Sequence, residues 1–226
     1  PQRGPLYFFF NRLLSMTEGR FIVLEGGDGV GKTTQAALLS SWLTAREIPH
    51  ILAREPGGTP VGEAIREIVL DRGDLEMPAE SEFLLILAAR AAFVHDIVRP
   101  ALEDGQVVLA DRFALSTLAY QGYGRGLDLG DVRDGLRIAT GGLRPDLYIV
   151  LDLPAKVAGD RQRRGGMEPD RIEKEGDGFL QSVRAGYLAL AETEPGVQVL
   201  DARGTPEQVH ATIRELLETC FPETFQ

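Results

Sequence analysis

The chain has 226 residues, of which 43% are apolar and 26% charged, which suits one globular domain and excludes a mainly disordered or low-complexity protein. Asp and Glu outnumber Lys and Arg by 34 to 24, a formal charge of −10, so we expect no nucleic-acid partner, because phosphate backbones are bound through basic surface. The single cysteine cannot form an internal disulfide, and no apolar run is long enough to span a bilayer, so we expect a cytoplasmic protein without a membrane partner.

The first fifteen residues are interpreted as an addition to the domain. Residues 6–14 are aromatic and apolar, but the stretch is too short to span a bilayer and Arg12 interrupts it. Met16 begins a segment that leads directly into a first strand. We expect residues 1–15 to be a disordered or non-native extension and residues 16–226 to form one domain. The alternative is that the extension is a short packing or membrane-touching arm.

Short apolar runs alternate with stretches of helical spacing along the rest of the chain. In chain order, the expected elements are strand 21–25, helix 34–46, strand 50–54, helices 62–70 and 79–102, strand 107–111, helices 116–120 and 131–140, strand 147–152, helices 154–164 and 179–194, strand 197–201 and helix 206–220. Strands separated by helices predict an α/β fold in three layers, with a five-stranded parallel sheet between helices.

A phosphate-binding loop is the most specific motif. Residues 26–33 (GGDGVGKT) fit the pattern G-x4-G-K-[ST] and lie between a predicted strand and a predicted helix. Its glycines let backbone N–H groups surround phosphate oxygens, while Lys32 would bridge the β- and γ-phosphates and Thr33 would bind Mg²⁺. The loop therefore predicts a nucleoside triphosphate site. Its expected ATP-binding residues are Gly26, Gly27, Asp28, Gly29, Val30, Gly31, Lys32, Thr33 and Thr34.

An acid and two groups of arginines extend this site. Asp111 ends the third strand, where a P-loop protein carries a second magnesium-side group, and its alternative role is a strand-end cap. Two arginine groups around one phosphate loop favour transfer between two phosphorylated substrates over hydrolysis of one. The second group would lie on a mobile lid at about 161–176, or else on a solvated helix end. The first group is Arg54, Arg66, Arg90 and Arg112, and the second is Arg161, Arg163, Arg164 and Arg171.

The sequence resembles thymidylate kinase (dTMP kinase) of the bacterial type over residues 20–226. The matching segments are LEGGDGVGKTT (24–34), REPGGT (54–59), GEAIREIVL (62–70), AAR (88–90), DR (111–112), STLAYQGYGRG (116–126), RPD (144–146) and DRIE (170–173). The resemblance implies a P-loop nucleoside monophosphate kinase that transfers the γ-phosphoryl group of ATP to dTMP with Mg²⁺. The alternatives are another nucleoside monophosphate or deoxynucleoside kinase, and a regulatory module that binds ATP without transferring phosphate.

The resemblance also implies roles for single residues. Arg66 and Arg112 would hold the dTMP phosphate, and Asp28 the sugar 3′-hydroxyl. Tyr120 would disfavour ribonucleotides. The remaining implied dTMP-binding residues are Arg90, Thr117, Gln121 and Ile86 around the base, together with Glu55 and Pro56.

Several catalytic and metal-binding roles follow from the same resemblance. Gly29 stands where one subgroup carries arginine, so the lid would supply the catalytic arginine from Arg161, Arg163 or Arg164. Lys32, Arg112 and Glu55 would complete the catalytic set, and Thr33, Asp111 and Glu55 would organise Mg²⁺.

Two features of the predicted helix at 79–102 carry further expectations. The family usually has a thymine-stacking aromatic residue where this chain has Ile86. Phe83, one turn earlier, is expected in the core, and the alternative is that it replaces the missing aromatic residue at the base. The helix also has more apolar positions than one buried stripe needs, and both this excess and the resemblance imply a homodimer through the helix.

Overall fold

The computed structural model describes residues 19–164 and 170–226. The predicted extension at 1–15 and residues 165–169 of the predicted lid lie outside these ranges, and within them the side chains of Arg163 and Arg164 are not described. Within the described ranges, no helix has the length and apolar character needed to cross a bilayer.

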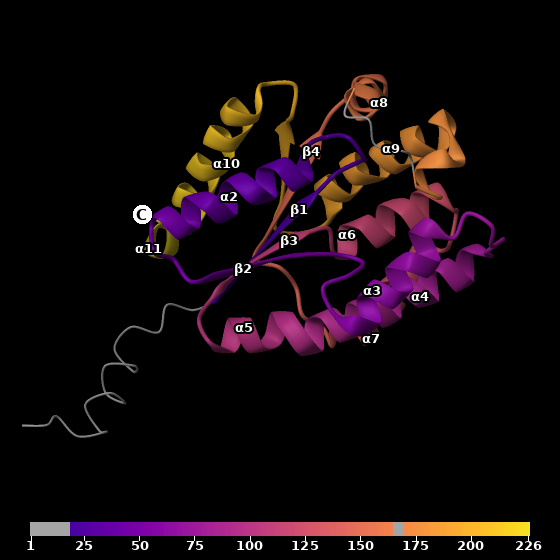
Figure 1. Ribbon diagram of the computed structural model, residues 1–226, viewed down its shortest axis with the longest axis horizontal. Helices are drawn as coiled ribbons and strands as arrows, with labels where there is room; N and C mark the ends of the chain where they lie inside the picture. The colour runs from indigo at the N-terminus through magenta and orange to yellow at the C-terminus, as the bar shows by residue number, and fades with distance from the viewer. Residues whose placement is uncertain (1–18, 165–169) are drawn as a thin grey trace, which may run out of the picture.

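A five-stranded, entirely parallel sheet forms the centre of the fold (Figure 1). The strand order is β2-β3-β1-β4-β5, so β1 lies in the middle. The predicted parallel sheet is confirmed, and four strands have their predicted bounds while β1 begins one residue earlier. The strands are β1 (Arg20–Glu25), β2 (His50–Arg54), β3 (Val107–Asp111), β4 (Leu147–Asp152) and β5 (Val197–Asp201).

Helices cover both faces of the sheet, which makes the three predicted layers (Figure 1). Successive side chains of a strand point to opposite faces, so Phe21 and Val23 of β1 join one core while Ile22 and Leu24 join the other. The second core is closed by α2 (Lys32–Ala45), α8 (Ala155–Arg164), α10 (Pro206–Cys220) and α11 (Pro222–Phe225). The first is closed by α3 (Pro60–Arg66), α4 (Ala79–Phe93), α5 (Arg99–Glu103), α6 (Ala114–Thr117), α7 (Leu129–Thr140) and α9 (Asp177–Thr193).

Three predicted helices contain π-helical turns that apolar spacing did not reveal. The helix expected at 79–102 is divided by η2 (Val94–Val98), just before Pro100, which lacks the N–H needed to continue the i→i−4 hydrogen bonds. The other two such turns are η1 (Glu67–Asp71) and η3 (Leu118–Gly124). The short helices η4 (Glu173–Glu175) and α11 were not predicted.

The start of α3 shows how local sequence positions a site residue. Thr59 caps the helix by accepting a hydrogen bond from Gly62 N at 2.9 Å, and Pro60 occupies the first helical position, where its missing N–H costs nothing. The helix then ends at Arg66, one of the predicted phosphate-binding arginines.

Candidate active site

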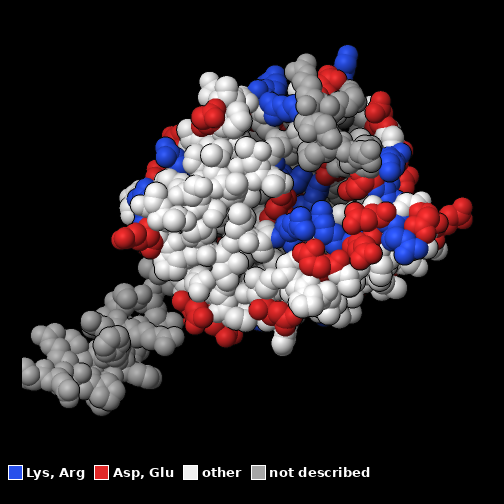
Figure 2. Space-filling model, in the orientation of Figure 1, with Lys and Arg blue, Asp and Glu red and all other residues white. Residues whose placement is uncertain are grey.

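A cleft of about 1440 Å³ opens at the carboxyl ends of β1, β2 and β3. This edge of a parallel sheet is where α/β folds bind ligands. Figure 2 shows Lys and Arg side chains gathered in the hollow, with Asp and Glu around it. The cleft brings together most predicted site residues: Asp28, Gly29, Val30, Gly31, Lys32, Thr33, Thr34, Glu55, Pro56, Arg66, Ile86, Arg90, Asp111, Arg112, Thr117, Tyr120, Gln121 and Arg161.

The phosphate loop is folded around its own lysine. Lys32 Nζ donates hydrogen bonds to the carbonyl oxygens of Gly26 at 3.1 Å and Gly27 at 2.6 Å. Gly26 has a φ of 128°, and a Cβ there would lie 2.4 Å from Leu151 O, so this position requires glycine. Burial, reinforced by the charge of Arg112, lowers the pKa of Lys32 to about 8. A bound phosphate would favour the ammonium form and raise this pKa again.

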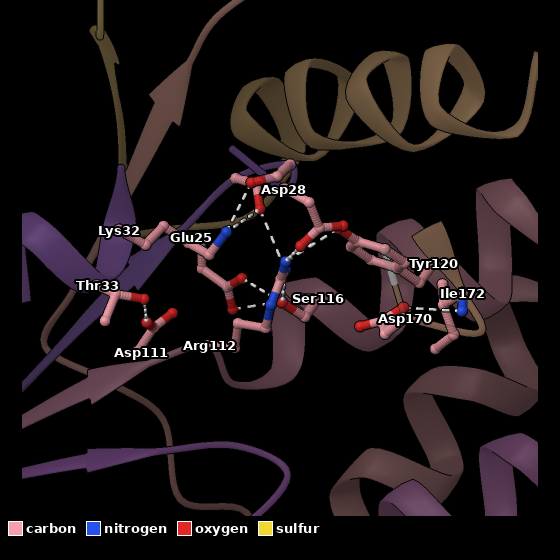
Figure 3. A network of polar contacts seen from close by, with 12 residues as sticks. Glu25, Asp28, Lys32, Thr33, Asp111, Arg112, Ser116, Tyr120, Asp170 and Ile172 are labelled. Atoms are coloured by element: carbon pink, nitrogen blue, oxygen red, sulfur yellow. Dashed lines mark hydrogen bonds and ion pairs between the residues drawn. The ribbon is translucent and has the colours of Figure 1, made fainter. Parts of the chain in front are cut away.

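Thr33 and Asp111 bring two oxygen-bearing side chains together beside the loop. Thr33 Oγ1 donates to Asp111 Oδ2 at 2.8 Å (Figure 3). A hydroxyl next to a carboxylate suits Mg²⁺, which prefers oxygen ligands and binds through one or two protein groups together with substrate phosphates and waters. No group of three or more His, Cys, Asp or Glu side chains suited to a metal occurs among the described residues. The suitability of the cleft for Mg²⁺ therefore depends on Thr33 and Asp111.

Arg112 is the centre of a second polar cluster (Figure 3). Its backbone has a φ of 77°, a left-handed conformation that is uncommon outside glycine, and its N–H donates to Leu24 O at 2.9 Å. Its guanidinium pairs with the Asp28 carboxylate and donates to Tyr120 OH at 3.0 Å, while Tyr120 OH donates to Asp28 Oδ2 at 2.6 Å. Burial opposes ionisation of Asp28, but the charges of Arg112 and Lys32 outweigh it and hold the Asp28 pKa below its usual value.

Arg66 reaches the same cleft from α3. Its NH1 donates to Pro56 O at 3.0 Å, and burial lowers the pKa of its guanidinium. Pro56 follows a cis peptide bond with Glu55. The predicted pair of phosphate-binding arginines therefore lines one cavity, Arg66 from α3 and Arg112 from the connection between β3 and α6.

A third cluster surrounds Arg90, which is nearly fully buried. Arg90 donates from Nε to Glu55 Oε2 at 2.7 Å and from NH1 to Thr117 Oγ1 at 2.6 Å, and its NH2 donates to Phe113 O at 2.9 Å. The structure thus brings Glu55, an expected magnesium-side residue, to Arg90. Glu55 Oε1 is buried and finds no hydrogen-bond partner in the described part of the chain. Burial raises the pKa of Glu55 to about 7, although the charge of Arg90 partly opposes this.

Ile86 and Phe83 lie on different sides of α4. Ile86 lines the cleft, as expected for the residue facing the base. Phe83 instead packs toward α7, where a Cβ on Gly135 would come within 2.6 Å of its ring. The core placement expected for Phe83 is confirmed.

The structure describes the side chains of two of the four arginines in the predicted lid. Arg161 donates from NH1 to Ala202 O at 3.0 Å and thus contacts the loop after β5. Arg171 donates from Nε to Val69 O at 2.7 Å and also pairs with Glu82. The side chains of Arg163 and Arg164 lie outside the described residues.

Comparison with known proteins decides the family. The family model described as thymidylate kinase matches residues 24–213. The chain belongs to the thymidylate kinase family.

Individual relatives agree with this assignment. The thymidylate kinase of Desulforudis audaxviator is 48% identical over 209 residues, covering 88% of this chain and 92% of that protein. That of Symbiobacterium thermophilum is 46% identical over 207 residues, covering 91% and 96%. The crystal structure of thymidylate kinase from Ehrlichia chaffeensis has a TM-score of 0.71 and 28% identity, and the match covers 88% of this chain and 98% of that one. The predictions of a kinase and of a P-loop fold are confirmed.

Sequence analysis of this thymidylate kinase family member missed two buried carboxylates, Glu25 and Glu82. Glu25 ends β1 and accepts hydrogen bonds from Phe113 N at 2.9 Å, Ser116 Oγ at 2.6 Å and Tyr187 OH at 3.0 Å, and burial raises its pKa. Ser116 and Tyr187 in turn accept hydrogen bonds from Arg112. Glu25 therefore binds the two hydroxyl groups that bind Arg112, one of the predicted phosphate-binding residues. An acid in an otherwise apolar strand was the one available signal.

Proposed function

We propose that the chain transfers the γ-phosphoryl group of ATP directly to dTMP, forming dTDP, with Mg²⁺. The observation that carries the proposal is that one cleft contains two separate sites for anionic groups. The phosphate loop with Lys32 provides one, and Arg66 with Arg112 provides the other. A hydrolase would need only the first.

Each part of the cleft has a role in the transfer. Lys32 and the loop N–H groups would bind the ATP phosphates, and Arg66 and Arg112 would fix the acceptor phosphate in line with them. Thr33 and Asp111 would hold Mg²⁺, which when bound neutralises charge on the triphosphate. The acceptor phosphate oxygen is itself the nucleophile, so the protein contributes positioning and charge, and no covalent enzyme intermediate forms.

The lid arginines complete this proposal. Arg161, Arg163 and Arg164 lie on α8, which leads from β4 past the phosphate loop; a Cβ on Gly29 of the loop would lie 2.5 Å from Ala158 O. Arginines on this helix would therefore neutralise negative charge on the transferred phosphoryl group.

An acceptor panel tests the function. Initial rates of ADP formation from ATP and Mg²⁺ would be measured with dTMP, with thymidine, with dCMP and with no acceptor. We expect rapid ADP formation with dTMP only, because thymidine lacks the phosphate that Arg66 and Arg112 bind. Equal rates with thymidine would indicate a deoxynucleoside kinase. No stimulation by any acceptor would indicate a module that binds ATP without transferring phosphate.

We also propose that the chain forms a homodimer through α4. The exposed side of this helix carries Leu84, Ala88 and Ala91, and Leu84 is 62% exposed. Ile138 on the adjacent α7 is 75% exposed. Apolar side chains gathered on neighbouring helices suit a helix-to-helix interface. Light scattering at micromolar concentration should give twice the chain mass, and Leu84→Glu should give a monomer. A monomeric wild-type protein would contradict the proposal.

A further inference from the structure

Glu82 is a fully buried carboxylate in the first turn of α4 that none of the steps above uses. Its Oε1 accepts hydrogen bonds from Gln121 Nε2 at 2.9 Å and Arg125 Nε at 3.2 Å. Its Oε2 accepts from Arg125 NH2 at 3.0 Å and from Arg171. Burial opposes ionisation, but hydrogen bonds from these three side chains lower the pKa of Glu82 below its usual value. The group is therefore a carboxylate at neutral pH, which can only accept hydrogen bonds.

This carboxylate determines which way the Gln121 amide faces. A glutamine amide has one donor end and one acceptor end, and only the NH₂ end can bind an ionised carboxylate. Gln121 is 1% exposed and lines the cleft beside Thr117. With Nε2 held by Glu82, the carbonyl oxygen Oε1 is the end that remains for a ligand.

Arg90, on the same wall of the cleft, offers a ligand only hydrogen-bond donors. Its guanidinium can only donate, and Glu55, Thr117 and Phe113 O hold three of its N–H groups. A ligand at this wall therefore meets an acceptor at Gln121 and donors at Arg90. The edge of thymine or uracil offers a donor at N3–H and an acceptor at O4, which matches both. In the pose that places N3 against Gln121 Oε1 and the 4-substituent against Arg90, cytosine sets an acceptor at N3 against the acceptor and its 4-amino donor against the donors, so it matches neither.

We propose that Glu82 is a positioning residue for base selection: by holding Nε2 of Gln121 it presents Oε1 to a pyrimidine with an N3–H group and disfavours cytosine. The inference rests on the proposed function, because it assumes that a pyrimidine nucleotide occupies this part of the cleft. Glu82 itself would not contact the substrate and would act through Gln121, which would.

The main test measures the ratio of kcat/KM for dTMP to kcat/KM for dCMP. Glu82→Gln keeps the shape of the side chain but can accept or donate, so Gln121 is no longer held in one orientation. We expect the ratio to fall about tenfold, the effect of one buried hydrogen bond, with kcat for saturating dTMP within about threefold of wild type. In a Gln121→Leu background, adding Glu82→Gln should change the ratio less than about twofold, because the Gln121 amide through which Glu82 acts is absent.

Arg125→Gln is the matched control. It removes one of the arginines that neutralise Glu82 but leaves the contact between Glu82 and Gln121, so the ratio should stay at its wild-type value even if stability falls. An unchanged ratio in Glu82→Gln, or an equal fall in Arg125→Gln, would overturn the inference.

A second measurement covers the case in which Glu82→Gln does not fold. N3-methyl-dTMP lacks the N3–H group, so the wild-type protein should discriminate against it about tenfold more strongly than Gln121→Leu does. Equal discrimination by the two proteins would overturn the inference. A wild-type protein without activity on dTMP would instead refute the proposed function, whereas an active wild type with unaltered ratios would refute only the role of Glu82.

Discussion

Asp28→Asn perturbs the cluster that links the phosphate loop to the second anion site. The Asp28 carboxylate pairs with Arg112 and accepts a hydrogen bond from Tyr120 OH at 2.6 Å, and it also balances the charge of Lys32. The substitution keeps the size of the side chain and one oxygen but removes its charge. Two neighbouring cations, Lys32 and Arg112, then lose the carboxylate that faces them.

The structure sets the size of the effect. Removing one partner of a buried ion pair costs about 3–5 kcal/mol, but the Asp28 and Arg112 side chains are each 17% exposed. Arg112 also keeps neutral acceptors at Gly26 O, Ser116 Oγ and Tyr187 OH. We therefore expect a loss of about 2–3 kcal/mol in the free energy of unfolding. At about 2–4 °C for each kcal/mol in a domain of this size, the Tm should fall by about 5–10 °C.

Calorimetry with and without pyrophosphate tests this reasoning. The unbalanced cations should bind an anion more strongly, so a fixed pyrophosphate concentration should raise the Tm of Asp28→Asn more than that of wild type. Asp74→Asn is the control, because it breaks an exposed pair with Arg72 that solvent screens, so its Tm should stay close to that of wild type. A Tm within about 1 °C of wild type for Asp28→Asn, or a smaller pyrophosphate shift, would refute the account of this cluster.

Three further predictions concern the base pocket, a buried acid and the lid. Ile86→Phe should tighten dTMP binding by about two- to tenfold in titration calorimetry, since an offset aromatic stack contributes roughly 0.5–1.5 kcal/mol; weaker binding by a folded variant would place Ile86 away from the base. Burial raises the pKa of Glu55 from 4.5 to about 7, so the folded chain holds a proton that the unfolded chain releases, and this contribution to stability is fully present below about pH 4.5 and lost as pH rises to 7. Glu55→Gln should make urea unfolding less pH-dependent between pH 5 and 7, and an unchanged slope would count against the raised pKa. Arg161→Ala and Arg164→Ala should lower kcat more than they weaken dTMP binding, and unchanged kcat in both would remove these two arginines from the transfer step.

The sheet and the phosphate loop could be predicted because their signals are local. A buried parallel strand is a short apolar run, and four of the five strands have the expected bounds. The loop at 26–33 is a contiguous pattern whose chemistry is set by its own glycines and Lys32. Five of the eight predicted arginines line the cleft, as expected from their positions after strands and on helices of the predicted sheet: Arg54, Arg66, Arg90, Arg112 and Arg161.

The buried carboxylates could not be predicted because their hydrogen-bond partners are residues far away along the chain. The partners of Glu82 lie 39, 43 and 89 positions away along the chain, and Tyr187 lies 162 positions from Glu25. Nothing in the neighbouring sequence separates Glu82 from an exposed acid in the first turn of a helix. The strand order and the π-helical turns were missed for a similar reason, since both depend on packing and not on the spacing of apolar residues.

Transfer of labelled phosphate tests the central claim most directly. ATP labelled with ³²P at the γ-position would be incubated with dTMP, Mg²⁺ and the protein, and the products separated by chromatography. We predict that the label appears in dTDP, with no labelled protein and little free phosphate, and that Lys32→Ala abolishes the transfer. Label released as free phosphate at the same rate with and without dTMP, or retained on the protein, would contradict direct transfer between two nucleotides in this cleft.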